Sequence, residues 1–192
     1  RIDPLWIIDL TDPRNLKKFS ELEVEGWSDY IYTWGDRLVT IGRGGENNRQ
    51  VAVSLYDVAN PETPAQLATV AIGEGYSWSE ASQDEKAFTV LPGAGLILVP
   101  YSGWAEESGQ AAKVQIIDLT RDTLKARGLI EHALQPRRAT LFGEQIISIS
   151  GRELLVVDAS DRDRPELLAE LELSWPVDRV LWPVNTSSNS LW

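Results

Sequence analysis

Short apolar runs that end in an aspartate recur along the chain and predict its architecture. The four runs are Leu5–Asp9, Val53–Asp57, Val114–Asp118 and Leu154–Asp158, and their aspartates lie 48, 61 and 40 residues apart. After each aspartate an Asp, Asn or Arg stands at position +3. Three copies align without a gap and carry apolar residues at positions +10, +13 and +15, whereas the third copy in order needs one deletion. A strand-rich repeat of this period is typical of a β-propeller.

A pair of strands joined by a tight turn is predicted between successive runs. The three pairs are Tyr30–Trp34 with Leu38–Gly42, Ala87–Leu91 with Leu96–Tyr101, and Ala139–Phe142 with Gln145–Ser150. Each pair is separated by a short segment that contains glycine, which supplies the positive φ that such turns need. The run that ends in aspartate is then the third strand and the segment after it the fourth. Four antiparallel strands of this kind make one blade.

The repeat divides the chain into blades. We expect a half blade at 1–26, full blades at 27–73, 74–132 and 133–173, the start of a further blade at 174–184, and a polar tail at 185–192. The predicted fold class is therefore all-β, a partial propeller of about four blades from a larger ring of about six to eight blades. A closed four-bladed ring is the alternative, and it would need the end of the chain to complete the last blade.

Three further expectations concern individual segments. Third strands alternate little between apolar and polar residues, which predicts burial on both faces between neighbouring blades. Glu166–Leu173 could place three leucines on one helical face, but the matching segments carry β-branched residues, so a strand is preferred. Arg43–Gln50 and Gly103–Ala112 are rich in glycine and charge, and both are predicted to be exposed loops.

Composition narrows the classes of function. The chain of 192 residues carries a net charge of −11, eight tryptophans and no cysteine. The negative charge argues against a nucleic-acid binder, because nothing would neutralise the phosphates. No apolar stretch reaches the length of a transmembrane helix, so direct membrane insertion of this segment is not expected. Disulfides and thiolate chemistry are excluded.

The acidic residues have a structural and a chemical interpretation. The aspartate that ends each third strand is expected to accept backbone N–H groups of the turn that follows. A cluster near the last copy could instead hold Ca²⁺ through its oxygen atoms, although two arginines within it would repel a cation. That cluster comprises Asp158, Asp161, Asp163 and Glu166, with Arg162 and Arg164 among them. The structural interpretation is favoured, and no metal site is predicted.

His132 is the only histidine in the chain. A Ser-His-Asp triad would have to use it, but no G-x-S-x-G turn is present to supply the serine. With the one-residue deletion, His132 falls in register with Val24, Ile72 and Leu173 of the other copies. The favoured interpretation is a fourth-strand residue that faces a neighbouring blade.

The links between blades are the main candidates for a binding site. In a propeller each link runs from an outer strand to the inner strand of the next blade, so it ends at the central channel. Charged residues of these links that could converge on the channel mouth are Asp29, Asp84, Glu85, Lys86, Arg137, Arg138, Asp178 and Arg179. They could form a closed ring of salt bridges, or a polar ligand site with Trp and Tyr walls.

Three stretches carry a resemblance to a known family. They are Asp3–Pro13, Tyr76–Ala81 with Lys86–Phe88, and Ile130–His132 followed by Arg137-Arg138. Together they resemble bacterial and archaeal secreted proteins with a C-terminal β-propeller domain that is distantly related to WD40 repeats. The resemblance spans residues 3–184, and Tyr76–Ala81 is its most specific part. It implies a secreted or cell-envelope protein without an established enzyme activity.

These observations lead to a functional expectation. We expect a non-enzymatic binding or scaffold propeller that uses no cofactor, with a ligand site formed by Trp78, Glu80, Lys86, Arg137 and Arg138. The partner is an unknown protein or small molecule, and self-association through open blade faces is a further expectation. One alternative is a Ca²⁺-dependent propeller hydrolase of the lactonase type. Another is a purely structural adhesion or assembly module.

Overall fold

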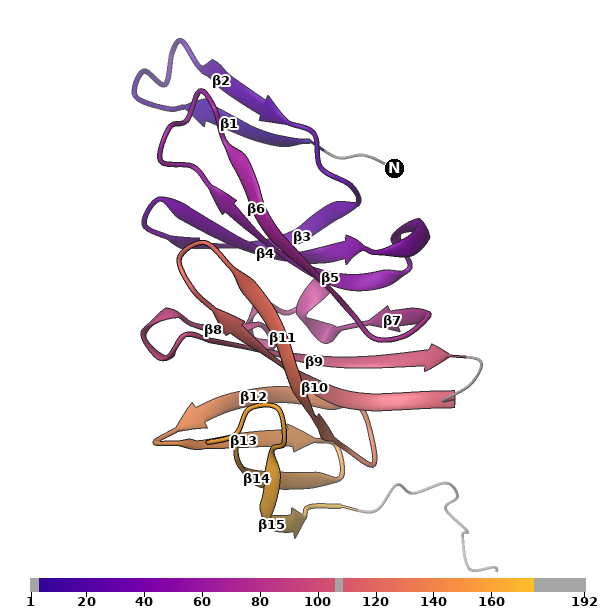
Figure 1. The fold of residues 1–192 in the computed structure, drawn as a ribbon. Coiled ribbons are helices and arrows are strands. Elements are labelled where there is room, and N and C mark those ends of the chain that lie inside the picture. The colour runs from indigo at the N-terminus through magenta and orange to yellow at the C-terminus, as the bar shows by residue number, and fades with distance from the viewer. Residues whose placement is uncertain (1–3, 106–108, 175–192) are drawn as a thin grey trace, which may run out of the picture.

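Four antiparallel sheets follow one another along the described part of the chain (Figure 1). The computed structural model describes residues 4–105 and 109–174. The first sheet holds β1 (Leu5–Asp9) and β2 (Lys17–Leu22), and the second holds β3 (Trp27–Trp34), β4 (Arg37–Gly44), β5 (Gln50–Asp57) and β6 (Ala65–Ile72). The third holds β7 (Tyr76–Trp78), β8 (Thr89–Leu91), β9 (Leu96–Ala105), β10 (Gly109–Leu119) and β11 (Leu124–Glu131). The fourth holds β12 (Pro136–Phe142), β13 (Gln145–Ser150), β14 (Glu153–Asp158) and β15 (Glu166–Glu172).

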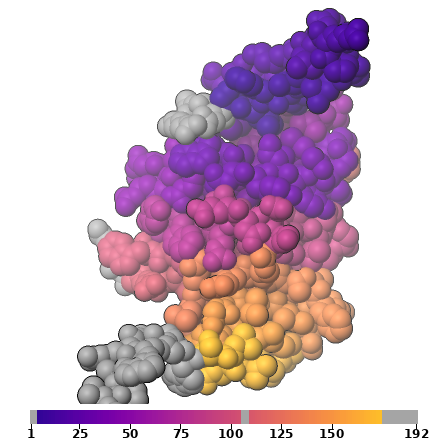
Figure 2. Space-filling model, turned by 180° about the vertical axis from the view of Figure 1, so that it is seen from behind, coloured from indigo at the N-terminus to yellow at the C-terminus, as the bar shows by residue number. Residues whose placement is uncertain are grey.

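The sheets stack face to face in an open arc, with β1 and β2 at one end and β15 at the other (Figures 1 and 2). This arrangement confirms the predicted all-β partial propeller with four-stranded antiparallel blades. The segment 166–172 is a strand, as preferred over the helical alternative. No helix in the described ranges combines the length and the apolar character that a membrane span requires. The predicted strand at 177–184 and the tail at 185–192 lie outside the described residues.

Two apolar clusters between the sheets form the core. One lies between the second and third sheets and includes Val39, Leu55, Ile97 and Ile117. The other lies between the third and fourth sheets and includes Leu98, Ile116, Ile146 and Leu155. The third sheet therefore has both faces covered, because a strand contributes alternate side chains to the two clusters.

Burial of the third strands depends on their place in the arc. β5 and β10 are buried on both faces, as predicted, because a sheet lies on each side of them. The prediction is wrong for β1 and β14, which belong to the end sheets. β14 alternates between buried and partly exposed residues, and Trp6 of β1 is 58% exposed. The same apolar pattern thus has a covered or an open face according to its neighbours.

The turn after each third strand is held by the predicted aspartate contacts in three copies. Asp9, Asp57 and Asp158 each accept a hydrogen bond from the backbone N–H two residues later, at 2.8–2.9 Å. The third copy differs, since Asp118 binds two arginine side chains and the hydroxyl of Thr120 accepts the turn N–H groups instead. The third copy is also the one that needs a deletion in the alignment.

The apolar position +10 of the repeat is a bulge on the fourth strand. The pairing register shifts by one residue at Phe19, Leu67 and Leu168, so each is an extra residue opposite its third strand. All three side chains are exposed, at 42%, 37% and 51%. A bulge increases the local twist and bends the strand. The repeated spacing therefore marks the bend of the outer strand rather than a core position.

Both segments that were predicted to be exposed loops contain regular structure. Within Arg43–Gln50, β4 runs to Gly44, η1 spans Glu46–Asn48 and β5 begins at Gln50. Gly103–Ala112 was predicted to be an exposed loop, but β9 and β10 remain paired as far as Ala105 and Gly109.

In the third sheet the inner strand is split into β7 and β8, both of which pair with β9. Two short 3-10 helices, η2 (Glu80–Ser82) and η3 (Glu85–Ala87), fill the interruption. Two more, η1 (Glu46–Asn48) and η4 (Pro92–Ala94), lie in connections between strands.

Candidate ligand-binding face

The stretch Tyr76–Ala81 alternates between side chains that hold the fold together and side chains that face outward. Ser77 is fully buried: its hydroxyl accepts from the N–H of Val51 at 2.8 Å and donates to the carbonyl of Ile72 at 2.6 Å. Ser79 donates to the carbonyl of Pro100 at 2.5 Å and caps η2 by accepting from the N–H of Ala81. The two serines clamp β7 onto the second sheet and onto β9. Both serines of the motif therefore have a structural role.

The alternate residues of the same stretch point away from these bonds. Tyr76 and Trp78 are 46% and 40% exposed, and Glu80 is partly exposed at the start of η2. Trp104, 56% exposed, lies opposite Tyr76 in the β7–β9 pairing, which places the two aromatic side chains on one face. The guanidinium of Arg43 lies 5.0 Å from the centre of the Tyr76 ring, within reach of a cation–π contact. Trp104 and Arg43 were missed by sequence reasoning, because strand register reveals Trp104 and the packing of one sheet on the next reveals Arg43.

The split in the inner strand places η2 and η3 between the inner strands of the neighbouring sheets. Helix η2 contacts β3 and β4, and η3 contacts β12. Asp84 caps η3 by accepting from the N–H of Lys86, and its second oxygen accepts from Arg138 at 2.6 Å. The hydrogen bond from Arg138, together with that from the Lys86 N–H, holds the pKa of Asp84 below its ordinary value. Asp84 and Arg138, two of the link residues that were expected to converge, therefore form a salt bridge.

The two inner strands that flank this insert carry a bulge at the same repeat position. The register of β3 with β4 shifts between Ser28 and Tyr30, and that of β12 with β13 shifts between Pro136 and Arg138. The extra residues are Asp29 and Arg137, both exposed. A bulge changes the direction in which a side chain projects, and bulges are common beside binding sites. An acidic side chain, Asp29, therefore projects from β3 on one side of η2 and η3, and a basic one, Arg137, projects from β12 on the other side.

The structure brings together part of the predicted site. Lys86 and Arg138 both lie beside Asp84, and Arg137 and Arg138 are adjacent on β12. Trp78 and Glu80 share the outward face of the motif. Within the described ranges no hydrogen bond or ion pair joins Trp78 or Glu80 to the arginines. Asp178 and Arg179 lie outside the described residues.

A groove recurs at three successive interfaces between neighbouring sheets, and each such interface is called a seam below. Each lies between the residues that follow a fourth strand and the third strand of the next sheet. The first groove contains Val24 and Ser54, the second contains Gly73, Glu74 and Gln115, and the third contains His132 and Glu153. Their volumes are about 210, 270 and 510 Å³ in that order. The repeat thus builds the same cavity with different chemistry at each seam.

His132 lies in the third groove and bridges two sheets through a buried polar network. Its Nδ1 lies 3.0 Å from Oε1 of Glu153, and its Nε2 lies 2.7 Å from Oγ of Ser148. Because a carboxylate can only accept, Nδ1 carries the proton and the Ser148 hydroxyl donates to Nε2. Burial lowers the pKa of His132 below its ordinary value, while Glu153 opposes that shift. The residue faces a neighbouring blade, as its favoured interpretation required.

This acid, imidazole and hydroxyl arrangement has the order of a hydrolytic triad but is closed to substrate. Ser148 is 0% exposed, and so is the His132 side chain. A nucleophile must reach the atom that it attacks. Ser148 is also absent from the lining of the neighbouring groove. In this conformation the network stabilises the seam rather than supplying a catalytic nucleophile.

The acidic cluster of the last copy is engaged in turn and seam contacts. Asp158 and Asp161 accept backbone N–H groups of their own turn, and Asp163 pairs with Arg127 at 2.7 Å. No group of three or more His, Cys, Asp or Glu side chains placed to hold a metal occurs within residues 4–105 and 109–174. The Ca²⁺-dependent alternative therefore gains no support from the described residues.

Comparisons with known proteins agree with the architecture. The family model described as "Beta propeller domain" matches residues 1–161. An uncharacterized protein of Methanocaldococcus jannaschii is 33% identical over 86 residues, which cover 45% of this chain and 13% of that protein. An uncharacterized protein of Archaeoglobus fulgidus is 30% identical over 98 residues, which cover 51% of this chain and 15% of that protein. The matched segments are thus a small part of both relatives.

Proposed function

Because the chain belongs to the Beta propeller domain family, we propose that it is a non-enzymatic binding or scaffold module that acts outside the cytoplasm. Its ligand contacts Trp78, Glu80, Lys86, Arg137 and Arg138 on the channel side of the arc. The observation that supports this proposal most directly is that buried and outward-facing side chains alternate in Tyr76–Glu80. Buried serines fix the backbone, while aromatic and acidic side chains face outward. The location outside the cytoplasm rests on the family resemblance alone.

The physical support is preorganisation of the exposed groups. Aromatic side chains on a rigid strand bury a large area without losing much conformational entropy, so they dominate many interfaces. Arg137, as a bulge residue, projects from a strand whose neighbours are fixed by pairing. Charged side chains of both signs beside exposed aromatic rings can bind a polar small molecule or a protein surface.

The test starts from a ligand screen and ends in matched variants. Wild-type protein is screened by thermal shift against small polar metabolites, and by affinity capture from an envelope extract. Each ligand found is then titrated against Trp78→Ala and Arg137→Ala, which are expected to weaken it at least about tenfold. Trp6→Ala is the control, because Trp6 is more exposed than Trp78 and lies at the far end of the arc. Ligands that bind all three variants equally would overturn the proposed site.

The open end of the arc supports the expected self-association. In the second sheet the cross-strand pairs Val39–Leu55 and Ile41–Val53 are fully buried under the next sheet. The matching pairs of the last sheet, Ile147–Val156 and Ile149–Leu154, are only partly buried. An apolar sheet face of this kind gains free energy when covered. Sedimentation equilibrium should show association that Ile149→Lys reduces, whereas unchanged association in that variant would place the contact elsewhere.

A further inference from the structure

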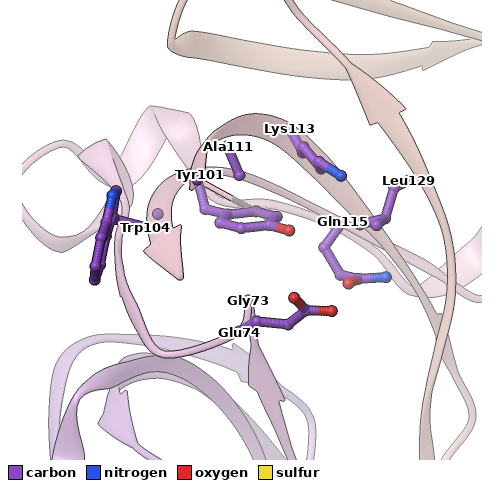
Figure 3. A pocket seen from close by; sticks show the side chains of 10 residues that line it. Gly73, Glu74, Tyr101, Trp104, Ala111, Lys113, Gln115 and Leu129 are labelled. Atoms are coloured by element: carbon purple, nitrogen blue, oxygen red, sulfur yellow. The ribbon is translucent and has the colours of Figure 1, made fainter. Parts of the chain in front are cut away.

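The middle of the three recurring grooves differs from the other two in how its polar groups are used. In the first groove Ser54 and Thr69 bond to each other at 2.9 Å. In the third groove His132 and Glu153 bond to each other and His132 bonds to Ser148. In the middle groove the polar side chains come from both sides of the seam and surround a shared space (Figure 3).

Strand register puts the lining residues on one face of the third sheet. Tyr101 pairs with Lys113, and Gly103 pairs with Ala111, across β9 and β10. Gln115 pairs with Leu129 across β10 and β11. Residues directly opposite in an antiparallel pair project to the same side. Glu74 closes the groove from the link that follows β6.

The Tyr101 hydroxyl is the decisive group. Tyr101 is only 4% exposed, yet its hydroxyl forms no hydrogen bond with any described residue. Figure 3 shows it directed into the space that Lys113, Gln115 and Glu74 also line. Burial, with added effects of Glu74 and Glu131, raises the pKa of Tyr101 to about 12, so the hydroxyl keeps its proton at neutral pH. The hydroxyl therefore borders the groove, where a bound molecule can reach it.

The neighbouring groups supply both donors and acceptors in fixed positions. The Gln115 amide nitrogen donates to the carbonyls of Ile116 and Arg127 at 2.9 and 2.8 Å, which anchors the side chain. Lys113 forms an ion pair with Glu131 at 2.9 Å across β10 and β11. Lys113, Glu74 and Glu131 together leave a net charge of −1 beside the groove, which disfavours an anionic ligand.

The shape sets the size of the ligand. The cavity of about 270 Å³ is far larger than the roughly 30 Å³ that one water occupies, and it is near the lower end for small-molecule sites. Four lining residues have no side chain or only a methyl group, so a ligand ring can approach the backbone there. They are Gly73, Gly103, Gly109 and Ala111. Leu129 adds an apolar wall for C–H groups.

We propose that this middle groove binds a neutral polyhydroxylated molecule of monosaccharide size, held by Tyr101, Lys113, Gln115 and Glu74. Each ligand hydroxyl can both donate and accept, which matches a wall that offers an ammonium and a phenol beside a carboxylate and an amide oxygen. The apolar face of a sugar ring fits Leu129 and Ala111. None of the five residues proposed above as ligand contacts lines this groove, so the inference does not rest on the function proposed above.

The test uses saturation-transfer NMR and calorimetry on the whole chain. The probes are D-glucose, D-galactose, D-mannose, N-acetyl-D-glucosamine and myo-inositol, with glycine and L-alanine as zwitterionic rivals. At least one polyol should bind the wild type. Tyr101→Phe, which removes only the hydroxyl, should weaken it roughly tenfold, and Ala111→Trp, which fills the groove, should abolish it.

Tyr56→Phe is the matched control, because it removes a hydroxyl from the first groove. It should leave polyol binding unchanged, and circular dichroism with thermal melts will show whether each variant is folded. The proposal is overturned if no polyol binds, if only the amino acids bind, or if folded Tyr101→Phe and Ala111→Trp bind like the wild type. Loss of binding in Trp78→Ala but not in Tyr101→Phe would assign the polyol to the channel side and overturn the groove assignment as well.

Discussion

The guanidinium of Arg162, in the turn after β14, donates to the carboxylate of Asp118 at the end of β10, with 2.5 Å between Nη1 and Oδ1. Arg162 also donates to the carbonyls of Gly95 and Ala94 at 2.8 Å. One side chain thus ties the turn of the last sheet to two connections of the preceding sheet. Arg121 and Asp36 make a comparable ion pair at the previous seam, again at 2.5 Å. Each of these two seams is latched at the rim by an arginine of the turn that follows a third strand.

Removal of the Arg162 latch should lower stability. Arg162→Met is expected to cost about 1–3 kcal/mol of unfolding free energy, because charge-assisted bonds at a partly buried site are lost together. Urea denaturation measures the loss. Arg164→Met is the control, since Arg164 is 86% exposed in its pair with Asp161 and should change stability by less than about 0.5 kcal/mol. Equal effects of the two substitutions would contradict the assignment of a latch to Arg162.

Ser77→Ala tests the clamp between the second and third sheets. The substitution leaves the N–H of Val51 and the carbonyl of Ile72 without the partner that Ser77 supplies. Each unsatisfied buried group costs about 1–3 kcal/mol, so a loss of roughly 2–4 kcal/mol is expected in urea denaturation. Ser82→Ala, in η2 and only partly buried, should cost much less. A loss below about 1 kcal/mol for Ser77→Ala would show that water or relaxation replaces the hydroxyl.

His132 makes stability depend on pH in a defined direction. Its pKa in the fold lies below the ordinary value of 6.5, so the unfolded chain binds the proton more readily than the folded one. The contribution is fully present above about pH 6.5 and is lost as the pH falls through the lower folded pKa. Unfolding free energies measured between about pH 5 and 8 should therefore decrease toward acid.

His132→Asn provides the comparison for that pH dependence. The variant should be less stable at neutral pH but should show a flatter slope between about pH 5 and 6.5. Carboxylates with depressed pKa values, including Asp9, Asp84, Asp158 and Asp161, lose their contribution at lower pH and affect both proteins alike. Parallel slopes for the two proteins across this window would rule out His132 as the source.

Gly26→Ala should be among the most harmful glycine substitutions. Gly26 has φ of 84°, and an added Cβ would lie 1.9 Å from the carbonyl oxygen of Arg43. The combined strain and overlap should cost more than about 3 kcal/mol. Gly35 also has a positive φ, of 60°, but has open space around it, so Gly35→Ala should cost only about 1–2 kcal/mol. Thermal melts of the two variants will separate overlap from backbone strain, and similar melting points would contradict the overlap at Gly26.

Sequence reasoning identified only part of the candidate site. It selected Trp78 and Glu80 from the motif, and Lys86, Arg137 and Arg138 from the links, because charged and aromatic residues in links stand out. It did not identify Trp104, which lies 28 residues after Tyr76 in sequence but directly opposite it in the pairing. Nor did it identify Tyr101, Lys113 and Gln115, which a one-dimensional pattern treats as ordinary strand residues.

The sequence by itself determined the features that depend on near neighbours. Most strands from Leu5–Asp9 to Glu166–Glu172 follow from short apolar runs bounded by turn residues, and the aspartate caps follow from contacts two residues apart. Only the tertiary structure decided which faces are covered and which side chains meet. Trp6 and Val53 occupy similar apolar runs, yet one is 58% exposed and the other 0%, because sheets pack on both sides of β5 but not of β1. Likewise His132 meets Glu153, and Arg162 meets Asp118, only through the packing of one sheet on the next, which no local pattern encodes.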